Sequence, residues 1–171
     1  VSLRISESRF LMKPSVYIES SVISYLVSKP SRDIIIAGRQ AITNDWWENH
    51  RHRFELRISI LVEEEIGKGD KGAAVLRMKV ADEIESVAIS EKANEIAGVL
   101  LLRCAVPRGS EEDALHIGIA AAQGMEYLLT WNFKHINNAE TKESVIEAVE
   151  SCGYECPQLC SPEELGGISD D

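Results

Sequence analysis

Short apolar runs without charge alternate along this sequence with longer segments of helical periodicity. Val16 to Ile18 is a β-branched and aromatic run, and Tyr127 to Thr130 contains no charged residue. Uncharged runs of this length are typical of strands covered on both faces, as in a parallel sheet. Because such strands alternate here with helices, the sequence predicts a three-layer α/β/α domain with a central, mostly parallel sheet.

The expected elements follow one another without a linker, an internal repeat or a low-complexity segment. We expect strands at residues 15–19, 54–60, 86–89, 127–130 and 158–160, the last at a sheet edge. We expect helices at residues 20–28, 31–53, 61–68, 71–81, 90–104, 110–124 and 140–151. Ser31 and Ser90 are the expected N-caps of their helices. Residues 1–12 are interpreted as an N-terminal extension, which leaves residues 13–171 as one domain.

The chain is acidic, with 171 residues and a formal net charge of −10. This charge argues against a broad basic face for nucleic acid, although a metal ion within an acidic cluster can still create a local phosphate site. The simpler interpretation of the acidic surface is solubility. No apolar run reaches the length of a membrane helix and no secretory signal pattern is present, so we expect a cytoplasmic protein without a membrane partner.

Four cysteines, at positions 104, 152, 156 and 160, contain no CxxC pair and have no histidine near them in the sequence. This spacing argues against a zinc site. A disulfide is one alternative, and reduced thiols, as is usual in a cytosolic protein, are the simpler interpretation.

One basic cluster, His50 to Arg53, lies at the end of the expected long helix, next to Trp46 and Trp47. Cations at a helix C-terminus are favoured by the helix dipole, and tryptophans usually pack in a core or a dimer interface. The functional alternative is a contact with RNA phosphates beside aromatic rings on which bases stack.

Four polar residues follow expected strands or lie at the starts of helices: Glu19, Glu65, Asp113 and Asn132. In a parallel sheet the carboxyl ends of all strands point the same way, so these side chains can share one edge. Carboxylates gathered there repel one another unless a divalent cation neutralises them, and oxygen ligands suit Mg²⁺ or Mn²⁺.

Each of these residues also has a structural interpretation. Asp113 is three residues after Ser110 and could complete a capping box. Glu65 could be solvated helix surface with Glu63 and Glu64, and Asn132 could be an ordinary turn residue.

The order of these residues resembles the PIN domains of VapC-like toxin ribonucleases over about residues 13–165. Tyr17-Ile18-Glu19-Ser20-Ser21 resembles the first motif of that family, and Glu65-Ile66-Gly67-Lys68-Gly69 resembles the second. Residues 113–120, DALHIGIA, resemble the third motif most specifically, and residues 128–136, LLTWNFKHI, resemble the fourth. Two positions depart from the family pattern, because Glu19 and Asn132 stand where the family usually or often has aspartate.

The resemblance implies a metal-dependent endoribonuclease, the toxin of a type II toxin–antitoxin pair. It implies that Glu19, Glu65 and Asp113 bind Mg²⁺ or Mn²⁺, and that Asn132 completes the catalytic set. Ser21, Thr130 and His116 are then expected to support the ligands or contact the substrate, while His135 is expected to pack with its apolar neighbours.

The same resemblance implies a small antitoxin that blocks the acidic site and a homodimer, for which the helix with Trp46 and Trp47 is the candidate surface. Two alternatives remain. Glu19 and Asn132 would suit a degenerate PIN domain that binds RNA or protein without cutting. A receiver-like phosphoacceptor module has similar topology, but its chemistry requires an aspartate where this chain has Glu19.

Overall fold

The computed structural model describes residues 12–166, so the expected extension lies outside the described residues except for Met12. Five strands form one sheet in the order β3-β2-β1-β4-β5, and every neighbouring pair is parallel. The strands are β1 (Ser15–Ile18), β2 (Glu55–Ser59), β3 (Glu85–Val87), β4 (Tyr127–Leu129) and β5 (Gln158–Cys160). The predicted parallel sheet is confirmed, with residues 158–160 at its edge.

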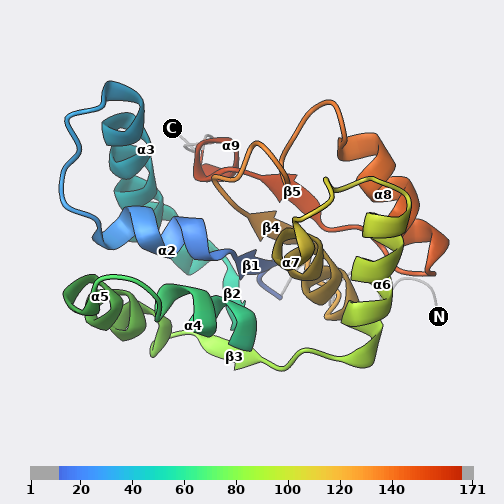
Figure 1. Ribbon diagram of the computed structural model, residues 1–171. Coiled ribbons are helices and arrows are strands. Elements are labelled where there is room, and N and C mark those ends of the chain that lie inside the picture. Colours follow the sequence, from blue (N-terminus) through green and yellow to red (C-terminus); the bar gives the residue numbers. More distant parts are fainter. Residues whose placement is uncertain (1–11, 167–171) are drawn as a thin grey trace, which may run out of the picture.

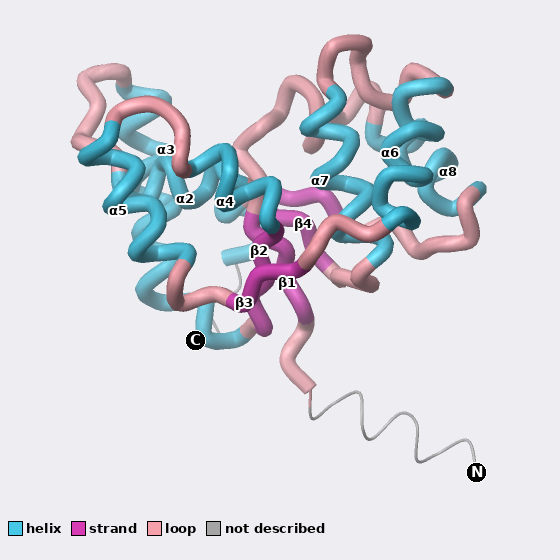
Figure 2. Tube along the Cα trace, turned by 60° about the horizontal axis from the view of Figure 1, so that its bottom comes forward, coloured by secondary structure: helices cyan, strands magenta, loops and turns pink. Residues whose placement is uncertain are grey.

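Helices cover both faces of the sheet, which confirms the three-layer prediction. Figure 1 shows α2 to α5 on one side of the strands and α6 to α8 on the other, and Figure 2 shows the same division. The bounds are α2 (Ser20–Val27), α3 (Ile34–Asp45), α4 (Ile60–Ile66), α5 (Lys71–Ala81), α6 (Glu91–Leu102), α7 (Glu111–Ala122) and α8 (Lys142–Ser151). A short helix that was not expected, α9 (Pro162–Gly166), follows β5 and packs near α3.

Strand β1 lies at the centre of the sheet, and the side chains of Val16, Tyr17 and Ile18 are fully buried. Ile18 is paired with Leu129 of β4, and the backbone N–H of Glu19 donates to the Leu129 carbonyl at 3.0 Å. β2 and β3 extend the sheet on one side of β1, while β4 and β5 extend it on the other. The carboxyl ends of β1 and β4 therefore meet at the topological switch point, where open α/β sheets bind their ligands.

Helix α7 is buried on nearly all sides, as its composition predicts. Ala114, Ile117, Ile119 and Ala120 are fully buried, and the polar His116 is only 1% exposed. A charged or polar side chain on such a helix needs a hydrogen-bond partner in the interior. We therefore expect both Asp113 and His116 to contact polar groups of neighbouring elements.

The N-terminus of α3 differs from the prediction. Asp33 is the N-cap, because its carboxylate accepts the N–H groups of Ile35 at 2.9 Å and Ile36 at 3.0 Å. Ser31 lies outside the helix and its hydroxyl accepts the N–H of Asp33 at 3.1 Å. Either residue type can cap a helix. Here the cap lies two residues later than expected, and Ile34 and Ile35 are exposed in the first turn.

Replacing Asp33 with alanine should destabilise the protein by about 1 kcal/mol, because two N–H groups at the start of α3 lose their acceptor. Ser31→Ala is the matched control and should cost only a few tenths of a kcal/mol, since one exposed hydrogen bond is lost. Urea unfolding of both variants measures the difference. Equal losses for the two variants would contradict the assignment of Asp33 as the cap.

The cluster of basic residues from His50 to Arg53 lies in a π turn and a 3₁₀ turn that follow α3. Trp46 is 1% exposed and stacks on Phe54 at 5.9 Å, which confirms that it packs in the core. Arg51 lies over Trp47 and 3.6 Å from Glu83. These turns lead into the amino end of β2, whereas the predicted acids lie at the carboxyl ends of the strands. The basic cluster is therefore at the opposite end of the sheet, and the predicted RNA contact there would lie away from the acids.

All four cysteines are free, as the sequence predicted. Burial raises the pKa of the Cys160 thiol to about 12, which makes a reactive thiolate unavailable there at neutral pH. Within residues 12–166 no helix combines the length and the apolar character needed to cross a membrane.

Candidate functional site

Glu19 follows β1 directly and is the N-cap of α2. Its carboxylate accepts the N–H of Ser21 at 3.1 Å. Aspartate is the usual acidic cap. The additional methylene of glutamate lets this side chain fold back onto its own helix, and the residue is only 5% exposed.

Three hydroxyl groups surround the Glu19 carboxylate. Thr130, at the end of β4, donates at 2.7 Å, and Ser21 donates to the same oxygen. Ser21 also accepts the backbone N–H of Trp131 at 2.9 Å, so it joins the start of α2 to the loop after β4. The contacts of Ser21 and Thr130 with a predicted ligand are those expected from the sequence.

Glu65, on α4, faces Glu19 across the side chain of Ser20. The Ser20 hydroxyl oxygen lies 2.7 Å from a Glu19 oxygen and 2.5 Å from a Glu65 oxygen. A hydroxyl has one proton, so Ser20 can donate to only one of the two carboxylates at a time. The pair therefore has more acceptor oxygens than the surrounding hydroxyls can satisfy.

His116 is the third member of this group. One ring nitrogen lies 3.0 Å from the Glu65 carboxylate and the other lies 2.8 Å from the Tyr17 hydroxyl, which in turn contacts Ser59 at 2.7 Å. Burial lowers the pKa of His116, but the hydrogen bond to Glu65 and the neighbouring carboxylates outweigh it and raise the pKa above its ordinary value. One imidazolium balances the charge of only one carboxylate.

Glu65 also has a shifted pKa. Burial alone would raise it, but the hydrogen bonds from His116 and Ser20 and the charge of His116 lower the pKa below its ordinary value. Glu65 is therefore ionised at neutral pH. The sequence also allowed Glu65 to be solvated helix surface, but its carboxylate is half-buried and hydrogen-bonded to His116 and Ser20.

Asp113, in the first turn of α7, belongs to an adjacent cluster rather than to the group of Glu19, Glu65 and His116. Its two oxygens contact the Asn132 amide nitrogen at 2.9 Å and the His135 ring at 2.8 Å. The expected capping box is not formed, because the Ser110 side chain makes no capping hydrogen bond. Asp113 is nonetheless close enough for its charge to raise the pKa of His116.

Asn132 combines the two roles that the sequence left open. Its amide oxygen accepts the backbone N–H of His135 at 3.0 Å and so stabilises the turn after β4. Because a backbone N–H can only donate, this bond determines the orientation of the amide and leaves the NH₂ group for Asp113. An aspartate here would place two carboxylates together, so the departure from the family pattern has a structural explanation.

Three residues that the sequence analysis did not place at the site take part in these contacts. Ser20 lies between two carboxylates, Tyr17 orients His116, and His135 contacts Asp113 instead of packing with its apolar neighbours. The sequence signal for Ser20 was its position beside the first acid. Tyr17 and His135 had no local signal, since their partners are distant in the chain.

The group of Glu19, Glu65 and His116 has the composition of a divalent cation site. Each residue offers one ligand atom, and these atoms all lie within 4.8 Å of one another. In the described part of the chain, no lysine or arginine forms a salt bridge with Glu19, Glu65 or Asp113. Glu19 and Glu65 carry two carboxylates against the single imidazolium of His116, and a divalent cation can neutralise the remaining charge, so these residues fit Mg²⁺ or Mn²⁺.

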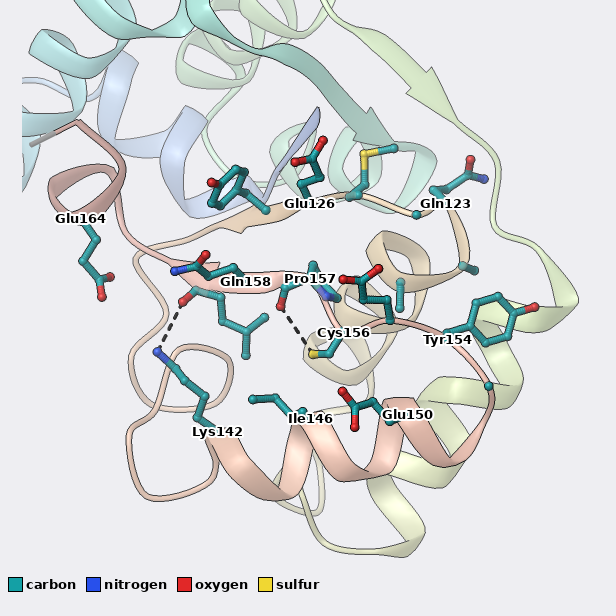
Figure 3. A pocket seen from close by; sticks show the side chains of 18 residues that line it. Gln123, Glu126, Lys142, Ile146, Glu150, Tyr154, Cys156, Pro157, Gln158 and Glu164 are labelled. Carbon is teal, nitrogen blue, oxygen red and sulfur yellow. Dashed lines mark hydrogen bonds between the residues drawn. The ribbon is translucent and has the colours of Figure 1, made fainter. Parts of the chain in front are cut away.

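A cleft of about 1010 Å³ lies at the opposite end of the sheet (Figure 3). It is lined by the start of β4, the segment leading into β5 and part of α8, and it contains none of the predicted site residues. Lys142 donates to the Leu159 carbonyl on the β5 edge, and burial raises the pKa of the nearby Cys156 thiol to about 12. The cleft is also lined by Glu126, Glu150, Glu155 and Glu164, but among the described residues only Glu19, Glu65 and His116 gather with metal-binding geometry.

No protein-family model and no curated protein matches this sequence, but solved structures match its fold. One is VapBC2 from Rickettsia felis bound to a DNA fragment from the promoter, with 14% identity and a TM-score of 0.52 over 85% of this chain and 97% of that one. Another is VapC20 from Mycobacterium tuberculosis, a sarcin-ricin loop cleaving toxin, with 13% identity and a TM-score of 0.52 over 82% and 96% of the two chains.

These matches define the class of fold. The chain has the three-layer PIN fold, which it shares with the VapBC2 and VapC20 structures. The resemblance to VapC-like PIN domains that the four sequence motifs predicted is thereby confirmed at the level of the fold.

Proposed function

We propose that this protein is a metal-dependent endoribonuclease that hydrolyses RNA phosphodiester bonds and acts as the toxin of a toxin–antitoxin pair. The observation that carries the proposal is the meeting of Glu19 and Glu65 with His116 at the switch point of the sheet, beside Asp113. The fold shared with VapC20, a sarcin-ricin loop cleaving toxin, supports ribonuclease activity over other uses of an acidic site.

In the proposed site, Glu19, Glu65 and Asp113 hold Mg²⁺ or Mn²⁺. When bound, the cation supplies positive charge for the phosphoryl oxygens and lowers the pKa of water. Thr130 and Ser21 keep Glu19 in one orientation, while Tyr17 and His116 do the same for Glu65. Residues that orient ligands in this way usually change metal affinity or activity 10- to 100-fold when removed.

Asn132 and His135 hold Asp113 on the other side of the site. Both of their hydrogen bonds run to the carboxylate oxygens, so they hold the charge at the start of α7 where the helix dipole also stabilises it. These contacts support an intact site and weaken the case for a degenerate domain based on Glu19 and Asn132.

The test is cleavage of structured and single-stranded RNA by the purified protein. We expect cleavage with Mg²⁺ or Mn²⁺, loss of cleavage with EDTA, and recovery when excess metal is returned. Metal binding without cleavage across a broad set of RNAs would favour the degenerate alternative. Stable phosphorylation of Glu19 by a small phosphodonor would favour the receiver-like one.

The proposed partners are RNA, a small antitoxin and a second copy of the chain. The predicted dimer surface cannot include Trp46, because that side chain is buried. The exposed apolar residues of α3 lie instead in its first turn, at Ile34, Ile35 and Ile36, and those of α5 are Val75 and Leu76. Light scattering of the protein alone tests the dimer, and co-purification with the product of a neighbouring small gene tests the antitoxin.

A further inference from the structure

Phe133 has a large apolar side chain that lies outside the buried core. It is 38% exposed and follows Asn132, whose amide holds Asp113. The loop after β4 thus places an exposed aromatic ring one residue from a contact of the acidic site. An isolated exposed aromatic residue needs no explanation, but this one packs against a buried tryptophan.

The buried tryptophan is Trp131. The rings of Phe133 and Trp131 meet edge to face, with centroids 5.9 Å apart and planes at 84°. Trp131 is 5% exposed, its indole N–H donates to Thr43 at 2.8 Å, and its backbone N–H donates to Ser21. Since Ser21 also binds the Glu19 carboxylate, the position of the aromatic pair is tied to that of the acidic site.

Arg39 of α3 packs against both aromatic rings. The carbon at the centre of its guanidinium group lies 5.1 Å from the centre of the Phe133 ring and 5.6 Å from that of Trp131. Among residues 12–166, Arg39 forms no salt bridge with a carboxylate. A planar cation beside an exposed ring combines the two groups on which unpaired RNA bases stack.

We propose that Phe133 and Arg39 form a stacking platform for one unpaired base of an RNA strand whose phosphodiester bond lies in the acidic site. This proposal rests on the proposed ribonuclease function and adds how the substrate is held. With a net charge of −10, the protein has little general attraction for phosphates. Stacking supplies affinity without positive charge and tolerates any base, so the platform requires a base but not a particular one.

The experiment compares wild type, Phe133→Leu and Phe133→Trp on one RNA oligonucleotide and on versions with a single abasic position scanned around the cut site. Phe133→Leu should raise KM about tenfold with little change in kcat, because base–aromatic stacking is the interaction removed. Phe133→Trp should restore the wild-type KM. Leu102→Ala, which changes another exposed apolar residue at the end of α6, is the matched control and should leave KM unchanged.

The abasic scan identifies the stacked base. At one position, loss of the base should raise KM for wild type by about the same tenfold factor and should add nothing to the defect of Phe133→Leu. A wild-type KM for Phe133→Leu, or abasic effects that add to the substitution at every position, would overturn the platform while leaving the nuclease function intact.

If wild type cleaves no RNA with Mg²⁺ or Mn²⁺, the proposed nuclease function fails, and binding still decides the platform. Fluorescence anisotropy of the same labelled oligonucleotide with Mn²⁺ should show about tenfold weaker binding by Phe133→Leu than by wild type. Equal binding by the two proteins would overturn the platform in that case.

Discussion

Asp113→Asn should reduce the rate of RNA cleavage at least about 100-fold and leave the protein folded, because one charged ligand of the proposed metal site is lost without a change in shape. Asp113 accepts hydrogen bonds from Asn132 and His135. The new amide keeps one oxygen for Asn132, and its NH₂ group can donate to His135 in the other tautomer. The substitution thus removes charge while retaining hydrogen bonds.

Glu112→Gln is the matched control. Glu112 is the preceding residue in the first turn of α7, its side chain is 62% exposed, and it lies 3.7 Å from Lys68. The control removes the same charge from the same helix end without touching the acidic site, so cleavage should stay within about twofold of wild type. If both substitutions reduced cleavage equally, the effect would belong to the helix dipole and not to a metal site.

Metal binding provides a second measurement that does not depend on cleavage. Titration with Mn²⁺, followed by electron paramagnetic resonance, should show weaker binding by Asp113→Asn than by wild type or Glu112→Gln. Unchanged Mn²⁺ affinity together with lost cleavage would place Asp113 outside the metal-binding set, beside Asn132 and His135. That outcome would be consistent with the contacts of Asp113, which lies outside the group of Glu19, Glu65 and His116.

The sequence predicted the parts of the fold that depend on local pattern. Strands β1 and β4 were recognised because uncharged β-branched and aromatic runs suit strands buried on both faces, and α7 because its apolar residues surround the helix. The cap of α3 was wrong because Ser31 and Asp33 are both good capping residues two positions apart. Local propensity does not distinguish them, and the side-chain hydrogen bonds of Asp33 do.

The carboxylates of the site could be named from the sequence, but their partners could not. Glu19 is 111 residues from Thr130, and Glu65 is 51 residues from His116. Which hydroxyl or ring nitrogen reaches each acid depends on the register of β1 with β4 and on the packing of α7. The same limit explains His135, whose apolar neighbours indicated packing although its ring contacts Asp113.

Gly118→Ala should destabilise the protein by about 2 kcal/mol or more, because α6 and α7 approach each other too closely at this position for a methyl group. A β-carbon added to Gly118 would lie 2.3 Å from the Ala93 carbonyl oxygen and 3.3 Å from the Ala97 backbone nitrogen. Both atoms belong to the backbone of α6, so no side-chain rotation relieves the contact. The two helices must separate, or one must shift along the other.

Gly98→Ala is the control, and we expect it to change the stability in the opposite direction. Gly98 is an exposed residue inside α6, and an added β-carbon there meets no atom within 4 Å. Alanine has the better helix propensity, so this variant should be about 0.5–1 kcal/mol more stable than wild type. Thermal unfolding of the two variants should therefore show shifts in opposite directions, with Gly118→Ala lowered by roughly 4–8 °C.

The position of Gly118 also links stability to the acidic site. It lies on α7 two residues after His116, whose ring must stay 3.0 Å from Glu65. A shift of α7 that accommodates the methyl group moves His116 and Asp113 together, so Gly118→Ala should bind Mn²⁺ more weakly even at temperatures where it is fully folded. Wild-type Mn²⁺ affinity in a destabilised Gly118→Ala protein would show instead that α6 moves and that α7 is held in place by its contacts with the sheet and the acidic site.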